Sequence, residues 1–308
     1  MISTLQQQEI LQIAKGTVRF NEPMREHTTI KIGGPADIWF EPLDAEDLLA
    51  VAKWADDRKL PRIVIGNGSN TLVRDGGIRG IVVSLAKFDY VNASPAEAGV
   101  TRALVGAGCL LQRLLSWAAE NSLTGLENLA GIPGTVGGAV IMNAGTKDGT
   151  MGDAVESIGL INKSKMSTME KEGLVFEYRR LKLPRAAIVI EANILLKQGE
   201  RSEIESKMAK IKQRRKEIQP LIWPSLGSVF KNPGSGSKAW QLVDDAGLRG
   251  VRVGGARISN EHANWIINEG NATAKDVEVL IKLIIEKVKD KSDVALETEI
   301  AMIGENLK

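Results

Sequence analysis

Residues 125–145 read GLENLAGIPGTVGGAVIMNAG, a stretch that holds six glycines and one proline. Such a density of glycine indicates backbone that takes unusual φ/ψ angles or lets another molecule approach the main chain closely. A loop with few side chains exposes its N–H groups, and several N–H groups that point one way bind an anion such as phosphate. A pair of tight turns inside a β-rich domain is the alternative interpretation of the same residues.

A second glycine-rich stretch, RIVIGNGSNT at 62–71, runs from a short apolar segment into a polar loop. This pattern is typical of a strand followed by a phosphate-binding loop. Neither stretch opens a helix with G-x-G-x-x-G spacing, and no P-loop lysine follows. We therefore predict that the two loops together hold one pyrophosphate of a bound dinucleotide.

Five strings, spread in order over the chain, carry a resemblance to a known family. They are HTTIKIGGPAD (27–37), GNGSNTLVRDGG (66–77), the 125–145 stretch, GSVFKNP (227–233) and LETEIAMIG (296–304). Together they resemble the UDP-N-acetylenolpyruvoylglucosamine reductases of peptidoglycan synthesis. The strings are long and chemically unusual, so the resemblance is specific.

The resemblance implies an α+β fold, with a two-part FAD-binding domain of the vanillyl-alcohol-oxidase (PCMH) type followed by a smaller α+β substrate-binding domain. We place FAD-binding subdomain 1 at 1–90, FAD-binding subdomain 2 at 91–200 and the substrate-binding domain at 201–308. The last of these carries the catalytic glutamate on its C-terminal strand.

Local patterns predict the elements within these domains. Apolar periodicity and caps predict helices at 4–15, 45–58, 110–121, 201–218, 238–246, 260–268 and 273–290. Alternating or β-branched runs predict a strand, a Gly-Gly-Pro turn and a second strand within 28–41, and further strands at 62–65, 80–85, 101–107, 155–161 and 188–196. Residues 92–99 are typical of a linker, and 249–258 of short strands.

Composition excludes several classes of function. The 308 residues carry 40 Lys+Arg and 38 Asp+Glu, a net charge of +2, which argues against a nucleic-acid or membrane-surface partner. Cys109 is the only cysteine, so no internal disulfide forms, and no histidine pair has metal spacing. We expect no metal, a cytoplasmic protein without a membrane span, and a monomer or weak oligomer.

The resemblance assigns the chemistry to three residues. Ser228 in GSVFKNP matches the serine that donates a proton, and Arg179 in EYRRLKL matches the active-site arginine. Glu297 and Glu299 lie on one face of an extended run, so spacing alone does not choose between them. The resemblance selects Glu299 as the active-site glutamate.

Cofactor and substrate residues follow the same strings. We expect FAD to be held without a covalent bond by Gly66, Asn67, Gly68, Ser69, Asn70, Gly131, Ile132, Pro133, Gly134, Thr135, Gly137, Gly138, Asn143, Ala144 and Gly145. Candidates for the substrate side are Lys231, Asn232, Arg249 and His262. The cluster Arg214-Arg215-Lys216 is typical of a solvated helix face, and one cation near a phosphate is the alternative.

Two departures from the family pattern concern the site. Leu181 stands two positions after Arg179, where the family has serine, and the residues after NAG at 143–145 are polar where the family tends to have small and aromatic ones. The chain also lacks a long tyrosine-bearing insertion after Tyr178-Arg179. It therefore resembles the shorter of the family's two forms.

The resemblance implies an FAD enzyme that takes hydride from NADPH and passes it to the enolpyruvyl group of UDP-N-acetylglucosamine enolpyruvate, giving UDP-N-acetylmuramate. Another FAD-dependent oxidase or dehydrogenase of the same fold, acting on an alcohol or sugar, is the alternative enzyme. A nucleotide-binding protein without catalysis is the alternative from a different class. A flavin spectrum that bleaches on addition of NADPH would exclude this last reading.

Overall fold

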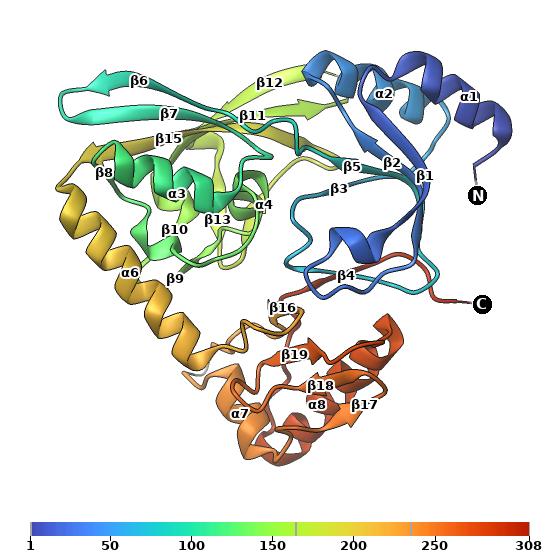
Figure 1. Cartoon of the computed structure of the whole chain (residues 1–308), viewed down its shortest axis with the longest axis vertical. Coiled ribbons are helices and arrows are strands. Elements are labelled where there is room, and N and C mark those ends of the chain that lie inside the picture. Colours follow the sequence, from blue (N-terminus) through green and yellow to red (C-terminus); the bar gives the residue numbers. More distant parts are fainter. Residues whose placement is uncertain (1, 164, 235, 308) are drawn as a thin grey trace. The chain divides into compact units, whose positions relative to one another are not determined.

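The computed structural model describes residues 2–163, 165–234 and 236–307. The chain divides into two compact units (Figure 1). Unit 1 comprises Met1–Phe20, Ile38–Asn67 and Gly80–Arg215, and unit 2 comprises Asn21–Asp37, Gly68–Arg79 and Lys216–Lys308. Two short N-terminal segments thus fold with the C-terminal third of the chain.

The first sheet of unit 1 has four strands in the order β1-β2-β5-β3. Their bounds are β1 (Thr17–Pro23), β2 (Pro35–Glu41), β5 (Ile78–Ser84) and β3 (Arg62–Ile65). Helices α1 (Thr4–Ile13) and α2 (Ala45–Asp57) bury apolar residues in the same core as this sheet, among them Ile10 and Leu48. Helix α2 begins where its cap predicts, because the side chain of Asp44 accepts a hydrogen bond from the Asp47 N–H at 2.8 Å.

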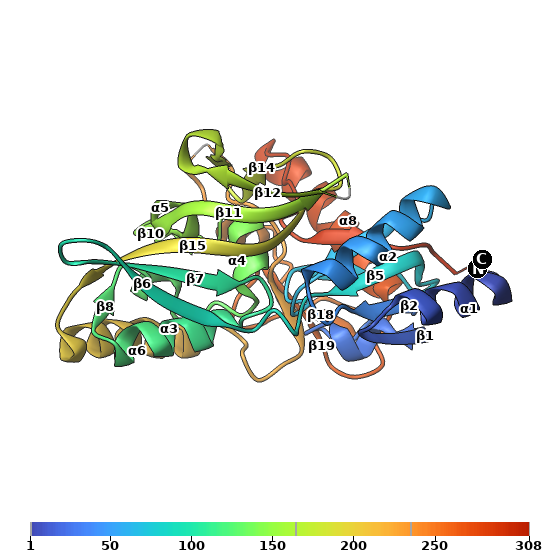
Figure 2. The same ribbon diagram turned by 90° about the horizontal axis from the view of Figure 1, so that it is seen from above.

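The second sheet of unit 1 has the strand order β12-β11-β15-β7-β6, with the short β8 paired to β15 (Figure 2). Its bounds are β6 (Val91–Glu97), β7 (Val100–Gly106), β8 (Leu123–Thr124), β11 (Val155–Asn162), β12 (Lys165–Glu170) and β15 (Ile188–Gln198). Helices α3 (Leu111–Glu120), α4 (Val136–Ile141) and α6 (Arg201–Ile218) share a core with this sheet. The helix that connects to unit 2, α6, is therefore anchored in unit 1 by Ile204 and Met208.

Short elements complete unit 1. They are η2 (Glu127–Leu129), β9 (Gly145–Thr146), β10 (Gly149–Thr150), α5 (Met151–Ala154), η3 (Lys171–Gly173), β13 (Val175–Glu177) and β14 (Arg180–Lys182). Strands β13 and β14 form a hairpin whose two-residue turn is Tyr178-Arg179, with Glu177 paired to Arg180. Leu181 of this hairpin is buried in the core of the second sheet.

Unit 2 contains a four-stranded antiparallel sheet in the order β16-β19-β18-β17. Its elements are η1 (Met24–His27), β4 (Thr71–Val73), β16 (Ser225–Ser228), α7 (Ala239–Asp245), β17 (Arg252–Val253), β18 (Ala256–Ile258), β19 (Trp265–Asn268), α8 (Ala274–Ser292) and β20 (Ala301–Ile303). Strand β20 pairs in parallel with β4. Ile30 and Leu72 from the two N-terminal segments are fully buried in the same core as α8, which explains why those segments belong to this unit.

The prediction of a helix at 260–268 was wrong, because this stretch ends in strand β19. All four residues of β19 are buried, and the strand lies between β16 and β18. A short strand buried on both faces shows no alternation of apolar and polar residues, so periodicity does not distinguish it from a buried helix segment.

The predictions for 92–99 and 28–32 were also wrong. Residues 91–97 form β6 at the edge of the second sheet. Polar side chains and Pro95 are tolerated there because one side of the strand has no ladder partner among the residues that the structure describes. Residues 28–32 form a turn in which the Thr28 hydroxyl donates to the Ile32 carbonyl at 2.7 Å and Lys31 has a φ of 60°. The preceding strand is β1, and the second predicted strand is confirmed as β2.

The helices among the described residues are all too short or too polar to cross a lipid bilayer.

The buried position of Leu181 gives a stability prediction. Leu181→Ala should lower the free energy of unfolding by about 2–5 kcal/mol, because a fully packed leucine leaves a cavity when it is truncated. Val175→Ala, on the exposed side of the same hairpin, should change it by less than about 0.5 kcal/mol. Urea denaturation of both variants measures the difference, and equal losses would contradict the packing described here.

Candidate active site

The two glycine-rich loops meet in unit 1. A Cβ placed on Gly66, directly after β3, would lie 2.6 Å from the Thr135 hydroxyl oxygen, a distance that real Cβ atoms do not show. Thr135 is the N-cap of α4, and its hydroxyl accepts a hydrogen bond from the Gly138 N–H at 3.3 Å. The predicted association of the two loops is therefore present at Gly66 and Thr135.

Several N–H groups in these loops have no acceptor among the residues that the structure describes. They belong to Asn67, Gly68, Gly131, Gly134 and Thr135. Other N–H groups are used inside the protein: Ile132 donates to Leu129 and Gly137 to Ala107. The N–H groups of Ile132 and Gly137, two of the predicted cofactor residues, are therefore already used by hydrogen bonds within the fold.

The glycines in these loops serve two different purposes. A Cβ on Gly137 would lie 2.8 Å from the Ala107 Cβ, and one on Gly68 would lie 2.1 Å from the His27 carbonyl oxygen, so the fold itself requires glycine at both positions. A Cβ on Gly138 would meet only the Thr135 hydroxyl, at 3.5 Å, which is an ordinary contact. Glycine inside a helix costs stability, and packing within the fold does not require it at position 138, which leaves room for the close approach of a pyrophosphate.

The NAG segment fixes the turn that carries Arg179. Asn143 is buried with a φ of 42°, accepts from the Gly152 N–H at 3.0 Å and donates to the Glu177 carbonyl at 3.1 Å. Arg179, with a φ of 59°, donates to the Gly145 carbonyl at 2.9 Å. The N–H of Ala144 is occupied by the carbonyl of residue 139. In this part of the loop, residues 143–145 hold Arg179 through main-chain and amide hydrogen bonds.

Unit 2 brings Ser228 and Glu299 onto neighbouring extended segments. Ser228 ends β16 directly after Gly227, whose φ is 73°. The Glu299 N–H donates to the Val229 carbonyl at 2.8 Å, and a β-bridge joins Phe230 to Thr298. The backbones of the predicted proton donor and the predicted glutamate are therefore one residue apart in antiparallel register.

Two asparagines position this pair of segments. Asn264 is buried and holds Phe230 from both sides, accepting from its N–H at 2.9 Å and donating to its carbonyl at 2.8 Å. Asn70, which the sequence assigned to the cofactor, donates to the Glu299 carbonyl at 3.1 Å and accepts from the Ala301 N–H at 2.9 Å. Sequence reasoning missed Asn264 because it lay in a stretch predicted as helix.

The structure separates the two candidate glutamates. Glu297 has a side chain that is 73% exposed and forms an ion pair with Lys231, whereas Glu299 is partly buried. A surface ion pair of this kind contributes little free energy. The surroundings of Glu299 suit a reacting group better than those of Glu297.

The remaining substrate candidates lie in unit 2, and each has protein partners. Asn232 accepts from the Ala239 N–H at 3.0 Å, and Arg249 forms a two-pronged ion pair with Asp244 and donates to the Asn260 carbonyl. Burial, followed by the positive charge of Arg249, lowers the pKa of His262 to about 4. The Nδ1 of His262 accepts from the Asn264 N–H at 3.3 Å, so the neutral ring carries its proton on Nε2.

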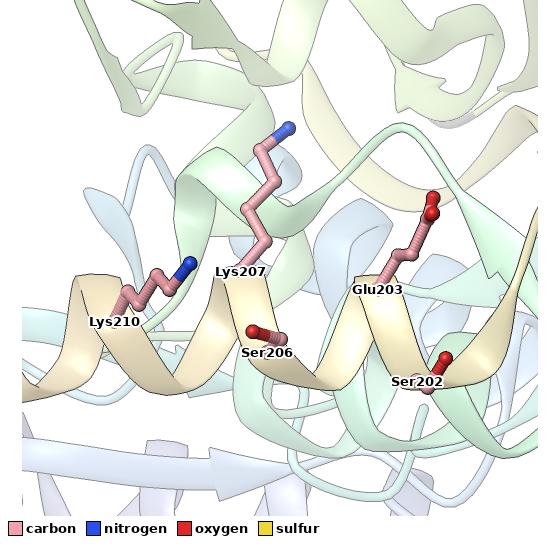
Figure 3. Close-up of a pocket in the computed structure, with 5 residues that line it drawn as sticks. All are labelled: Ser202, Glu203, Ser206, Lys207 and Lys210. Atoms are coloured by element: carbon pink, nitrogen blue, oxygen red, sulfur yellow. The ribbon is translucent and has the colours of Figure 1, made fainter.

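Among the described residues, no group of three His, Cys, Asp or Glu side chains is arranged to hold a metal ion. A hollow on α6 is lined by Ser202, Glu203, Ser206, Lys207 and Lys210 (Figure 3). None of these residues is a sequence-predicted site residue, and Lys207 lies 4.0 Å from the buried carboxylate of Glu127. The hollow and the candidate active site therefore have no lining residue in common.

The low pKa of His262 gives a pH prediction. Because its pKa is about 4 in the folded chain and about 6.5 when unperturbed, the unfolded state binds the proton more readily between these values. The free energy of unfolding should therefore fall as the pH is lowered from about 6.5 towards about 4. In the His262→Gln variant, the free energy of unfolding should lose the part of its pH dependence that comes from this histidine. Denaturation of both proteins at neutral pH and at pH about 5 would measure the difference. An unchanged pH dependence in the variant would contradict a buried, neutral His262.

Two family models match the chain. One, described as the C-terminal domain of UDP-N-acetylenolpyruvoylglucosamine reductase, matches residues 219–303, and one described as an FAD binding domain matches residues 36–164. The first covers Ser228, and the second covers both glycine-rich loops.

Relatives match over nearly their whole length. The UDP-N-acetylenolpyruvoylglucosamine reductase of Geobacter metallireducens is 41% identical over 94% of this chain and 95% of its own, and that of Desulforamulus reducens is 40% identical over 99% and 100%. The crystal structure of the Thermus caldophilus enzyme matches with a TM-score of 0.79 and 37% identity, over 94% of this chain and 99% of that one. The chain belongs to the UDP-N-acetylenolpyruvoylglucosamine reductase family.

Proposed function

We propose that this chain uses NADPH to reduce UDP-N-acetylglucosamine enolpyruvate to UDP-N-acetylmuramate, with FAD as a non-covalently bound cofactor. Family membership and the match of an FAD binding domain to residues 36–164 support the reaction and the cofactor. The observation that carries the proposal is the antiparallel register that brings the segment of Glu299 beside that of Ser228.

The residues that would hold FAD are those with unoccupied N–H groups and open space. The N–H groups of Asn67, Gly131, Gly134 and Thr135 and the free side of Gly138 suit a pyrophosphate, because main-chain N–H groups bind phosphate oxygens without side-chain bulk. When bound, FAD supplies hydride that originates from NADPH and is taken up by the vinyl carbon of the substrate. The residues of the protein must then stabilise the negative charge that develops on the substrate and supply one proton to it.

Hydride addition to the vinyl carbon leaves negative charge on the adjacent carbon and its carboxylate. Ser228 would donate its hydroxyl proton to that carbon, which completes the addition of one hydride and one proton across the double bond. Arg179 would supply fixed positive charge for the intermediate. Glu299, with its carboxyl group protonated, would donate a hydrogen bond to the intermediate or assist the proton transfer. A serine hydroxyl is a weak acid, so this requires a strongly basic carbon held close to it.

Lys231, Asn232, Arg249 and His262 are proposed for the substrate side. Cationic and amide groups suit diphosphate and carboxylate recognition. The hydrogen bonds described above leave specific groups for this task, since neutral His262 offers an Nε2–H donor and no charge. To bind the substrate, Lys231 would have to break its ion pair with Glu297.

We further propose that the protein works in the cytoplasm as a monomer or weak oligomer. The use of NADPH and a nucleotide-linked sugar supports this location, and the single cysteine, Cys109, is buried. Sedimentation at several protein concentrations tests the oligomeric state.

The separation of the reaction into two halves tests the residue roles. Ser228→Ala and Glu299→Gln should retain FAD and bleach with NADPH, because neither group acts while the flavin is reduced. Reoxidation by the enolpyruvyl substrate should then slow by about 10²–10⁴-fold in each, the usual contribution of a general acid or base. Anaerobic stopped-flow absorbance at the flavin band measures both halves.

Glu297→Gln is the matched control, since it removes a charge from the same face and only a surface ion pair. If it stalls reoxidation while Glu299→Gln does not, the glutamates have been assigned the wrong way round. Loss of NADPH bleaching in the Ser228 and Glu299 variants would show that these residues support flavin binding. An oxidase of the same fold would instead show flavin reduction by its substrate in the wild type.

A further inference from the structure

Arg215 lies against the main glycine-rich loop. It is the last residue of unit 1, near the C-terminal end of α6. A Cβ placed on Gly131 would lie 2.9 Å from the Arg215 Cδ and 3.2 Å from its Nε. Gly131 also has a φ of 76°, which favours glycine. The loop backbone and the arginine stem therefore occupy adjoining space, with no room for a side chain between them.

The guanidinium of Arg215 has no partner among residues 2–163, 165–234 and 236–307. Its Nε is buried without a hydrogen-bond acceptor among these residues, and no carboxylate among them acts on its charge. Burial, with no compensating negative charge, lowers the pKa of Arg215. Arginine nevertheless stays protonated in proteins, so the fold holds a charged group that is partly removed from water and uncompensated.

Three other arginines, Arg79, Arg179 and Arg257, also have a buried Nε without a hydrogen-bond acceptor, but each has a partner at another guanidinium nitrogen among the described residues. Arg74 is paired with Glu278 at 2.7 Å, and Arg249 with Asp244. Arg214 and Lys216, on either side of Arg215 along α6, are exposed, as expected for a solvated face. Of the three cations in this cluster, only Arg215 is turned into the protein.

A partly buried cation without a counter-charge costs free energy unless an anion binds to it. Gly131 and Gly134, on the same loop, have N–H groups without an acceptor among the described residues. The cation and these N–H donors would all bind an anion. A guanidinium binds phosphate oxygens with two parallel hydrogen bonds, which suits a pyrophosphate. We infer that Arg215 is the counter-charge for the FAD pyrophosphate, held against Gly131 before the cofactor arrives; this rests on the proposed use of FAD.

The test compares flavins with and without phosphate. The full chain, stripped of flavin, is titrated with FAD and with riboflavin by fluorescence quenching, as wild type, Arg215→Met and Arg214→Met. Methionine keeps an apolar stem against Gly131 but removes the charge. Arg215→Met should raise the Kd for FAD by about 10- to 100-fold, the effect of losing a hydrogen bond to a charged group, and leave that for riboflavin near wild type. Arg214→Met removes an equal charge from the exposed face of the helix and should change neither the Kd for FAD nor the Kd for riboflavin.

A second measurement separates ligand binding from support of the fold. Because Arg215 is uncompensated without cofactor, flavin-free Arg215→Met should melt at or above the temperature of flavin-free wild type. Added FAD should raise the melting temperature of the variant less than that of the wild type.

Three results would overturn the inference. An unchanged Kd for FAD would place the anion of Arg215 elsewhere, for example on the substrate diphosphate. An equal loss for FAD and riboflavin would place its contact on the flavin ring. A lower melting temperature of the flavin-free variant would make the role structural. A wild type that binds no FAD would instead contradict the proposed function itself.

Discussion

The close approach of Gly66 to Thr135 is the contact on which the candidate site depends. It brings the loop after β3 against the start of α4, and a side chain at Gly66 would displace the hydroxyl that caps that helix. The same loop continues into unit 2, where Gly68 packs against the His27 carbonyl and Asn70 holds the Glu299 segment. One short glycine-rich segment thus has fixed neighbours in both units, and its small residues follow from those contacts.

Most of the partly buried ionisable side chains discussed above are either paired with an opposite charge or neutral. Arg249 and Arg74 are satisfied by carboxylates, and His262 stays neutral because burial and Arg249 disfavour its charged form. Arg215 departs from this rule, and it does so against a loop in which the N–H groups of Gly131 and Gly134 also lack an acceptor among the described residues. Unsatisfied donors and an uncompensated cation in one place are what a phosphate-binding site has before its ligand arrives.

Sequence patterns predicted the elements whose signals are local. Helix α2 was predicted from its Asp44 cap and apolar pattern, and α8 from its apolar stripe. Strand β19 was missed because four consecutive buried residues have no period, and β6 because an edge strand tolerates polar residues and proline. Whether such a segment forms a strand depends on its position in the sheet, and a local sequence pattern does not contain that information.

The site shows the same division. Ser228 and the two glutamates could be named from the sequence, but only long-range pairing shows that Glu297 is exposed and bound to Lys231. Arg214 and Arg215 are identical letters side by side, and only the packing of α6 against Gly131 distinguishes them. Likewise, Gly137 and Gly138 are equivalent in sequence, whereas a Cβ on Gly137 would clash with Ala107 and one on Gly138 would make only an ordinary contact with the Thr135 hydroxyl.

This last pair offers the most direct test of the claim that the loops form a cofactor site. Flavin content and the melting temperature of the flavin-free chain should be measured for Gly138→Ala. Because a Cβ at Gly138 meets only an ordinary contact and alanine favours a helix over glycine by roughly 0.5–1 kcal/mol, the variant should melt at or above wild type. Its ratio of flavin to protein absorbance should nevertheless fall clearly below that of the wild type, since the added methyl group occupies the space proposed for the pyrophosphate. Full flavin content in a stable Gly138→Ala protein would contradict the account.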